Sequence, residues 1–503
     1  MSWHQPELPR IHEDVLCRAW QTDPYVSDPQ SVTSTISHFF AHLDSTALRF
    51  LPEKAFKAWL VQSSAAHSRK SPEDMMLVYS ILALGVALSG GPKNIAFEYA
   101  QVARYATEHA AGLSLQLVQA RIVLSLYYLS ISRLSDANDM SSAAISVATC
   151  LQLNLEMEQS QDANLAVFPY GLSRHGYAEC RRRTFWSCFI LERTNGLFPG
   201  RVSIINSEDV FLRLHGDVKS FEEQVEVDTP IFEPNSSSAE HQQRGVGAMG
   251  YLVRIVNLWG DMMTMLYRTV HRASISDSDI LSFHRRLIQR LEDWRLSLPE
   301  AFRFSTNLEG IDQEIRGSFV SMHLVYFMTM IKLHRYAPPK SAVSASRLET
   351  VRSEAKAMLG MISTFEGGLI QLQPTIPPPF IAGAIVETVD ILSAAGPVSD
   401  LASLIRKLSS AKAVLDMLNG VWENSGVHKM VVDRRIGELN SLHEGPEADS
   451  PIAGARLFLY GQDSHGDSAA PVAWWQISDA LETRFPKDMD TVYQPLTPVL
   501  LDN

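Results

Sequence analysis

Apolar side chains recur three and four positions apart along most of the chain, which is the spacing of one face of an α-helix. In one example, the helix-start signal Ser-Pro-Glu-Asp at 71–74 and the stop signal Gly-Gly-Pro at 90–92 enclose such a run. No run of alternating polar and apolar residues is long enough for a central sheet. The pattern predicts an all-α fold of packed antiparallel helices. Besides 75–88, helices are expected over 93–112, 114–134, 137–157, 177–195, 251–270, 279–296, 318–336, 346–365, 380–394, 400–424 and 429–442.

Breaks in this pattern indicate how the chain is organised. Residues 217–244 are acidic and then serine-rich, which is typical of an exposed linker. After His443, glycines and prolines interrupt the helical spacing. We therefore expect an N-terminal segment at 1–29, one large helical body at 30–444 that contains the linker, and an irregular C-terminal tail at 445–503.

Charge and cysteine content narrow the function classes. The 503 residues carry a formal net charge of -12, and an acidic protein is poorly suited to binding DNA phosphates by charge. Four cysteines stand far apart, with no spacing typical of disulfide frameworks. The most apolar runs, 75–88 and 319–331, are shorter than the roughly 20 residues that cross a bilayer, and the N-terminus lacks a signal-peptide pattern. These features predict a soluble intracellular protein without a membrane segment.

The stretch 179–201, ECRRRTFWSCFILERTNGLFPGR, combines three successive arginines with bulky aromatic residues. On a helix, apolar side chains around 185–191 point in nearly every direction, so this part is expected to be buried. Buried arginines call for packed stems and for carboxylates at their guanidinium groups. Arg182 is also placed to stack on Trp186 one turn later. The structural interpretation is favoured over a nucleic-acid contact, because short basic runs are weak motifs.

The same stretch resembles the signature of the fungal-specific transcription factor domain, the middle homology region of zinc-cluster regulators. In that family a basic, aromatic helix with an acid–arginine pair precedes Gly-Arg-Pro. Val202 stands here in place of the expected proline, so the turn there is expected to differ. The resemblance implies a structural role for the matching residues, which are Arg181, Arg182, Arg183, Phe185, Trp186, Glu192, Arg193, Gly200 and Arg201.

Further segments resemble this family in the same order, and together they cover about 71–395. They are 77–92, 117–130, 143–156, 290–299 and 321–336. The resemblance implies a helical regulatory body in a nuclear fungal regulator or co-regulator, not an enzyme. It also implies pathway-specific control, for example of a metabolic or secondary-metabolite gene set.

The DNA-binding head of that family is not recognisable in this sequence. The head normally holds two zinc ions with six cysteines, whereas here only Cys17 precedes residue 150. The expected partners are therefore the transcription machinery or a DNA-binding partner protein, without direct DNA binding by this chain alone. Two alternatives stay open: a truncated zinc-cluster transcription factor, and a small-molecule-binding helical protein derived from a regulator.

No catalytic, cofactor or metal residues are predicted. Residues 245–250 read Gly-Val-Gly-Ala-Met-Gly, but no strand precedes them as dinucleotide binding requires. His38 and His42 lie one helical turn apart without an evident third ligand. A small-molecule effector pocket is the remaining option, although its lining more often forms core. The candidate lining residues are Met322, Tyr326, Phe327, Met330, Tyr127 and Tyr128.

The C-terminal tail mixes bulky and acidic residues. Trp474, Trp475 and Phe485 stand among acids such as Asp479 and Glu482, a composition found in activation segments, where charges keep aromatic side chains available to a coactivator. The competing interpretation, which we favour, is that the tryptophans anchor the tail to the helical body, because large exposed apolar patches are uncommon.

Overall fold

The structure is a computed structural model that describes most of the chain up to Glu444. In these parts it contains seventeen α-helices, short 3-10 helices and two isolated β-bridges, but no sheet. The all-α prediction is confirmed. No helix among them combines the length and apolarity needed to cross a membrane. The described residues are 11–46, 49–65, 70–194, 203–235, 245–271, 274–305, 310–335, 344–368, 380–393 and 401–444.

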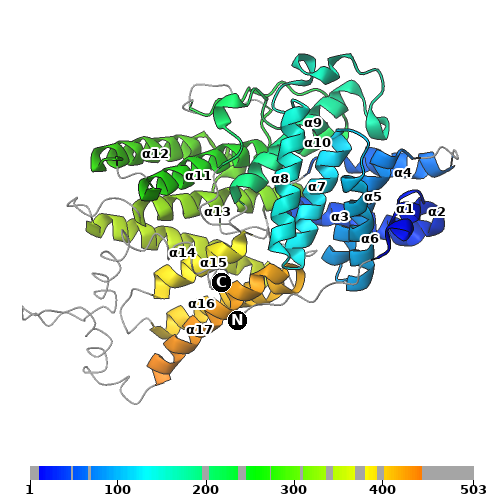
Figure 1. Cartoon of the computed structure of the whole chain (residues 1–503). Coiled ribbons are helices and arrows are strands. Elements are labelled where there is room, and N and C mark those ends of the chain that lie inside the picture. Colours follow the sequence, from blue (N-terminus) through cyan, green and yellow to red (C-terminus); the bar gives the residue numbers. More distant parts are fainter. Residues whose placement is uncertain are drawn as a thin grey trace, which may run out of the picture.

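The N-terminal part is built around α5, which is buried along almost its whole length. Helices α3, α6 and α7 all pack against it, and α8 packs against α7 (Figure 1). Ser71 caps α5 by accepting a hydrogen bond from the backbone N–H of Asp74, as the start signal predicts. The helices of this part are α1 (Glu13–Trp20), α2 (Pro24–Ser27), α3 (Pro29–Thr46), α4 (Glu53–Ala65), α5 (Pro72–Leu88), α6 (Lys93–Glu108), α7 (Leu115–Ser130) and α8 (Leu134–Cys150).

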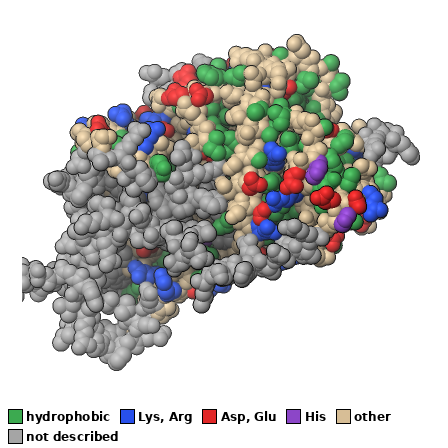
Figure 2. Space-filling view, in the orientation of Figure 1, with side chains coloured by type: hydrophobic (Ala, Val, Ile, Leu, Met, Phe, Trp, Pro, Cys, Tyr) green, Lys and Arg blue, Asp and Glu red, His purple; other side chains and the backbone are tan. Residues whose placement is uncertain are grey.

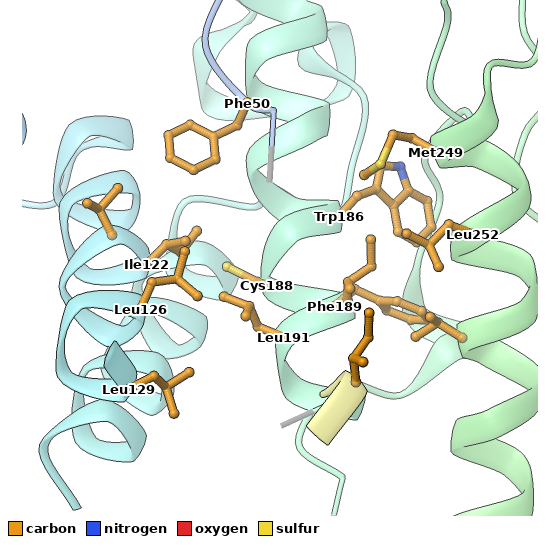
Figure 3. Packing of buried hydrophobic residues seen from close by; sticks show 14 of the residues in the cluster. Phe50, Ile122, Leu126, Leu129, Trp186, Cys188, Phe189, Leu191, Met249 and Leu252 are labelled. Carbon is orange, nitrogen blue, oxygen red and sulfur yellow. The ribbon is translucent and has the colours of Figure 1, made fainter. Parts of the chain in front are cut away.

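Helix α9 (Arg174–Thr194) joins this part to the second half of the molecule. In Figure 3, Cys188 and Leu191 face Ile122, Leu126 and Leu129 of α7 on one side of it. On the other side, Trp186 and Phe189 face α11 (Figure 3). The apolar part of α9 is therefore buried on both sides, as its sequence predicts.

The second half is a helical array that begins with α11 and α13 side by side. Helix α13 packs between α11 and α14, and it also touches α3 of the first half. Helices α14 to α17 continue the array below it in Figure 1. The bounds are α10 (Val218–Glu222), α11 (Ala248–His271), α12 (Asp277–Ser297), α13 (Gln313–Arg335), α14 (Ser344–Gly368), α15 (Ile381–Ser393), α16 (Leu401–Val421) and α17 (Gly426–Glu444).

Three predicted helices end at least four residues earlier in the structure than the apolar pattern indicates. One is α6, which ends at Glu108 instead of 112, and the others are α7 and α8. Helix α7 ends at Ser130 and α8 at Cys150, whereas the expected ends were 134 and 157. Just beyond each end, one residue has a positive φ: 59° at Ser132 and 54° at Gln152. A left-handed residue reverses the chain at a helix C-terminus, and that position is usually glycine. Serine and glutamine gave no sequence signal for it.

The predicted exposed linker, 217–244, is partly a fixed segment. Within its described part, 217–235, the short helix α10 buries Phe221, and Phe232 is also buried. The Glu222 carboxylate accepts hydrogen bonds from the backbone N–H groups of Glu53 and Lys54 at 2.9 and 3.1 Å, at the start of α4. Acidic composition predicts exposure, but this acid caps another helix. Residues 236–244 lie outside the described parts.

Candidate functional site

Helix α9 carries the arginine-rich signature and is the best-supported candidate site. Successive helical residues point about 100° apart, so Arg181, Arg182 and Arg183 extend in three directions. Arg181 and Arg182 both reach the irregular segment that follows α8, whereas Arg183 reaches the backbone at Gly216. The three arginines therefore make separate contacts around one helix turn and do not form a continuous basic surface.

Arg181 fastens the segment that follows α8. Its Nε donates to Asp162 at 2.8 Å, and its two terminal nitrogens donate to three backbone carbonyls, those of Leu151, Gln152 and Leu155, at 2.7–3.0 Å. The side chain is almost fully buried. A guanidinium can satisfy several acceptors at once in one plane, which explains why arginine fits where carbonyls without helical partners converge.

Arg182 forms a bidentate pair with Glu156. Its Nε and Nη2 donate to the two carboxylate oxygens at 3.1 and 2.7 Å, and its Nη1 pairs with Glu179. Glu156 Oε1 also accepts the backbone N–H of Arg213 at 2.7 Å. Arg182 thus extends to carboxylates and not over the Trp186 ring, so the predicted stacking is wrong. Among the three successive arginines, the guanidinium over an aromatic ring is that of Arg183.

Arg183 holds the chain on the other side of α9. Its Nη2 donates to the carbonyl of Gly216 at 2.8 Å, its Nε donates to Glu179 at 2.7 Å, and its guanidinium carbon lies 4.2 Å from the Phe221 ring centroid. Burial by itself would raise the pKa of Glu179, but Arg183 and Arg182 outweigh burial and hold that pKa at about 2. Glu179 is therefore ionised throughout the physiological range.

Trp186 bonds α9 to the backbone at Arg213, whose N–H is bound by Glu156. Its Nε1 donates to the carbonyl of Arg213 at 3.0 Å, and its ring meets Phe189 and Phe232 edge-on. The His215 ring is tilted relative to the same ring, with centroids 6.3 Å apart. Burial, with help from Arg183, lowers the pKa of His215 to about 3, so the imidazole is neutral.

Glu192 and Arg193 clamp the chain that returns after α9. Glu192 accepts the backbone N–H of Ile204 at 2.8 Å, and Arg193 donates to the carbonyl of Ile205 at 2.9 Å. The Arg193 guanidinium carbon lies 3.6 Å from the Phe189 ring centroid. From α11, Trp259 Nε1 donates to the Arg193 carbonyl at 2.9 Å. The acid–arginine pair thus fixes 203–207 between α9 and α11.

The structure places most of the predicted signature residues in one body of contacts. Phe185 is buried, with its ring edge-on to Trp186. Gly200 and Arg201 lie outside the described residues, as do Trp474, Trp475 and Phe485 of the tail. The acids that complete the site, Glu156, Asp162 and Glu179, were not singled out from the sequence. Only Glu179 carried a local signal, because it lies three and four residues before two arginines.

The glycines at 245–250 serve close packing. Gly245 has φ +77°, and a side chain on Gly247 would meet the Gly216 carbonyl oxygen at 2.7 Å. The Gly247 N–H donates to the carbonyl of His215 at 3.1 Å. These glycines let the start of α11 approach the 214–217 backbone. No parallel sheet adjoins them in the described chain, so the dinucleotide-binding geometry is missing there.

The remaining candidate chemistry is not assembled into a site within the described parts. His38 is exposed and its ring bonds to the Ser34 carbonyl, while His42 is buried. No group of three potential metal ligands occurs among the residues searched. Burial raises the pKa of Cys180 and Cys188 to about 12, so these thiols are protonated and unreactive at neutral pH.

The proposed effector-pocket residues pack as core. Met322, Tyr326, Phe327, Tyr127 and Tyr128 are all buried in the hydrophobic cluster, and Met330 packs against it. The Tyr326 ring stacks on Trp294, with centroids 5.5 Å apart, and is edge-on to Phe327. These side chains therefore form part of the hydrophobic core.

The fold and the contacts of α9 define an all-α body organised around one arginine-rich helix. Residues 36–296, more than half of the chain, match the fungal specific transcription factor domain. The chain therefore belongs to that family of transcription factor domains. The matched range includes α9 with its three arginines, its aromatic residues and its acid–arginine pair.

Curated relatives come from two fungi. Two uncharacterized transcriptional regulatory proteins of Schizosaccharomyces pombe are each 26% identical, over 188 residues (34% of this chain, 23% of that protein) and 287 residues (52% and 28%). A Zn(2)-C6 fungal-type transcription factor of Fusarium oxysporum f. sp. lycopersici is 25% identical over 204 residues (37% and 21%). The chain thus spans about a quarter of the length of these relatives. No solved structure matches it.

Proposed function

We propose that the chain acts as a fungal transcriptional regulator or co-regulator, in which the helical body binds other proteins and catalyses no reaction. The observation that carries the proposal is the match of 36–296 to the fungal specific transcription factor domain. The names of the relatives, which are transcriptional regulatory proteins and a transcription factor, support it. The contacts of α9 support a body that binds proteins and not phosphate, because its three arginines donate their hydrogen bonds within the chain.

The proposal extends to location and partners. A regulator of this family works in the nucleus, and we propose the same for this chain, with control of a particular pathway's genes. Its net charge is -12 and it has four cysteines, so we propose that it reaches DNA through a DNA-binding partner protein. The transcription machinery is the second expected partner, and a small-molecule effector remains a proposal without an assigned site.

Tethering tests the regulatory role directly. The full chain is fused to a heterologous DNA-binding domain and placed upstream of a reporter gene in a fungal host. We expect reporter output to rise or fall several-fold relative to the DNA-binding domain alone. The Trp186→Ala fusion, which removes a buried anchor, should lose this effect. Unchanged output from a stable, nuclear wild-type fusion would overturn the proposal.

A binding assay tests the route to DNA. Purified chain is titrated against defined duplexes at physiological salt, where sequence-specific binders reach nanomolar affinity and depend steeply on salt. We expect no specific binding. Tight binding to one duplex, with the salt slope of several phosphate contacts, would show that the chain contacts DNA by itself.

A further inference from the structure

The segments held by α9 form a small ribbon on the surface of the molecule. A parallel bridge joins Leu155 to Phe211, and an antiparallel bridge joins Arg213 to Ile231. The Phe232 N–H donates to the Leu212 carbonyl at 2.7 Å. Along 210–214 the side chains alternate: Val210, Leu212 and Leu214 are buried, whereas Phe211 points outward. Alternation of this kind gives the ribbon one core face and one outer face.

The outer face carries bulky apolar side chains in solvent. Phe211 is 53% exposed and Ile231 is 55% exposed. Ile231 lies opposite Arg213, so Phe211 is its diagonal neighbour, within about 7–8 Å. Figure 2 shows hydrophobic side chains over the upper part of the molecule, where Figure 1 draws the segments around α9.

Charge around this face is strongly acidic. Residues 203–235 contain eight acids and only two basic residues, Arg213 and Lys219, a net charge of -6 out of -12 for the chain. Glu208, Asp209 and Asp228 are exposed and lie within three residues of Phe211 or Ile231 along the chain, and Asp228 forms an ion pair with Arg213. We call Phe211, Ile231, Glu208, Asp209 and Asp228 the ribbon face.

The backbone under the ribbon face is held from both sides. The Arg213 N–H donates to Glu156, which Arg182 binds, and the Arg213 carbonyl accepts from Trp186. Arg193 fixes the approach to the ribbon through Ile205 and Ser207. A surface fixed before binding loses little conformational entropy when a partner docks. The buried contacts of α9 therefore hold an acidic and apolar face in place on the outside of the molecule.

We propose that the ribbon face binds a basic amphipathic helix of a partner protein. Leucine-like side chains of that helix cover Phe211 and Ile231, and its lysines or arginines meet Glu208, Asp209 and Asp228. Charge decides between occupants: nucleic acid is repelled, and so is this chain's own tail, which has nine acids and three basic residues in 445–503. The inference names a partner class for the proposed regulator but is tested without transcription.

The probe is a fluorescein-labelled synthetic helix of leucine and lysine with one apolar face. Fluorescence anisotropy measures its binding to the full chain as NaCl is increased. We expect binding that weakens with salt, and much weaker binding of the same helix with glutamate in place of lysine. A shuffled leucine–lysine peptide without an apolar face should also bind less.

Matched variants locate the site. Phe211→Ser with Ile231→Ser should weaken binding at least about tenfold, because both bulky contacts are lost. Val61→Ser with Ile95→Ser, two exposed aliphatic residues on α4 and α6, should leave it unchanged. Asp228→Lys should weaken binding more than Glu98→Lys, an exposed acid on α6.

Three results would overturn the inference: no binding of the leucine–lysine helix, equal binding of its glutamate version, or equal losses in the ribbon and control variants. The thermal midpoints of all variants are measured alongside, and exposed positions are expected to change them little. If the peptide does not bind but the tethered chain still changes reporter output, the proposed function is retained and only this inference is wrong.

Discussion

At the residue scale, Arg181 shows that the shape of the guanidinium matters as well as its charge. Its guanidinium serves one carboxylate and three backbone carbonyls at once. A lysine ammonium keeps the charge but has no planar fork. Arg174, on the same helix, also donates to a carbonyl, that of Ala163, but its side chain is 44% exposed. The two positions therefore form a matched pair.

We expect Arg181→Lys to lower the free energy of unfolding by at least about 2 kcal/mol, because buried carbonyls lose their donors. Arg174→Lys should change it by less than about 0.5 kcal/mol, because water replaces the lost contact. Urea unfolding followed by circular dichroism measures both. Similar losses in the two variants would show that the buried fork has no special role.

Buried histidines make stability depend on pH. Burial lowers the pKa of His215 to about 3 and that of His323 to about 4, so both are neutral in the folded chain. Unfolded histidine has a pKa near 6.5. Their contribution is fully present above pH 6.5 and is lost as pH falls, toward pH 3 for His215 and toward pH 4 for His323. At pH 5 the loss is about 2 kcal/mol for each histidine.

The measurement is the urea midpoint between pH 7.5 and 5. Wild type should lose stability steadily below pH 6.5, and the double variant His215→Gln, His323→Gln should show a flatter dependence from a lower starting point. Glu179, with its pKa held at about 2, adds a further loss only below pH 4.5. An unchanged slope in the double variant would contradict the assignment to these two rings.

Residue chemistry in α9 was predictable in kind but not in partner. The run of aromatic residues after three arginines indicates burial, and buried guanidinium groups need acceptors. Nothing local identifies Asp162 or Glu156 as those acceptors, because they lie 19 and 26 residues before Arg181 and Arg182. Their meeting depends on how the irregular segment after α8 folds back, which is a tertiary property.

At the element scale, the start of α11 depends on glycine for its position. A Cβ on Gly247 would stand 2.7 Å from the Gly216 carbonyl oxygen, so the backbone of one segment would have to move. We expect Gly247→Ala to cost about 2 kcal/mol or more, as overpacking of a tight contact does. Gly420→Ala in α16, where nothing lies within 4 Å of the new Cβ, should be neutral or stabilising by up to about 1 kcal/mol.

Thermal unfolding of the two glycine variants checks this expectation. A wild-type midpoint for Gly247→Ala would mean that α11 is loosely placed against the 214–217 backbone. Helix existence, unlike helix placement, followed from apolar spacing along the chain. The helix ends just before Ser132 and Gln152 could not be predicted from the sequence. Both residues adopt a positive φ, and neither residue type favours that conformation.

At the scale of the whole molecule, the tail stays a prediction, since 445–503 lie outside the described residues. Residues 445–503 fused to a heterologous DNA-binding domain are assayed with a reporter in yeast. Activity lost on changing Trp474, Trp475 and Phe485 to alanine would support an activation segment, whose aromatic side chains enter a coactivator groove. A silent fusion, with the full chain destabilised by the same changes, would instead support anchoring to the body.

The reach of Arg183 has a consequence for how the protein is made. Its side chain bonds to the Arg49 carbonyl, 134 residues earlier in the chain, and to the Gly216 carbonyl, 33 residues later. During synthesis, the first helices leave the ribosome long before Gly216 does. Until residues 203–235 emerge and pack against α9, these helices lack part of their contacts and expose apolar surface. The nascent chain is therefore expected to need chaperone cover until residue 217 has left the exit tunnel.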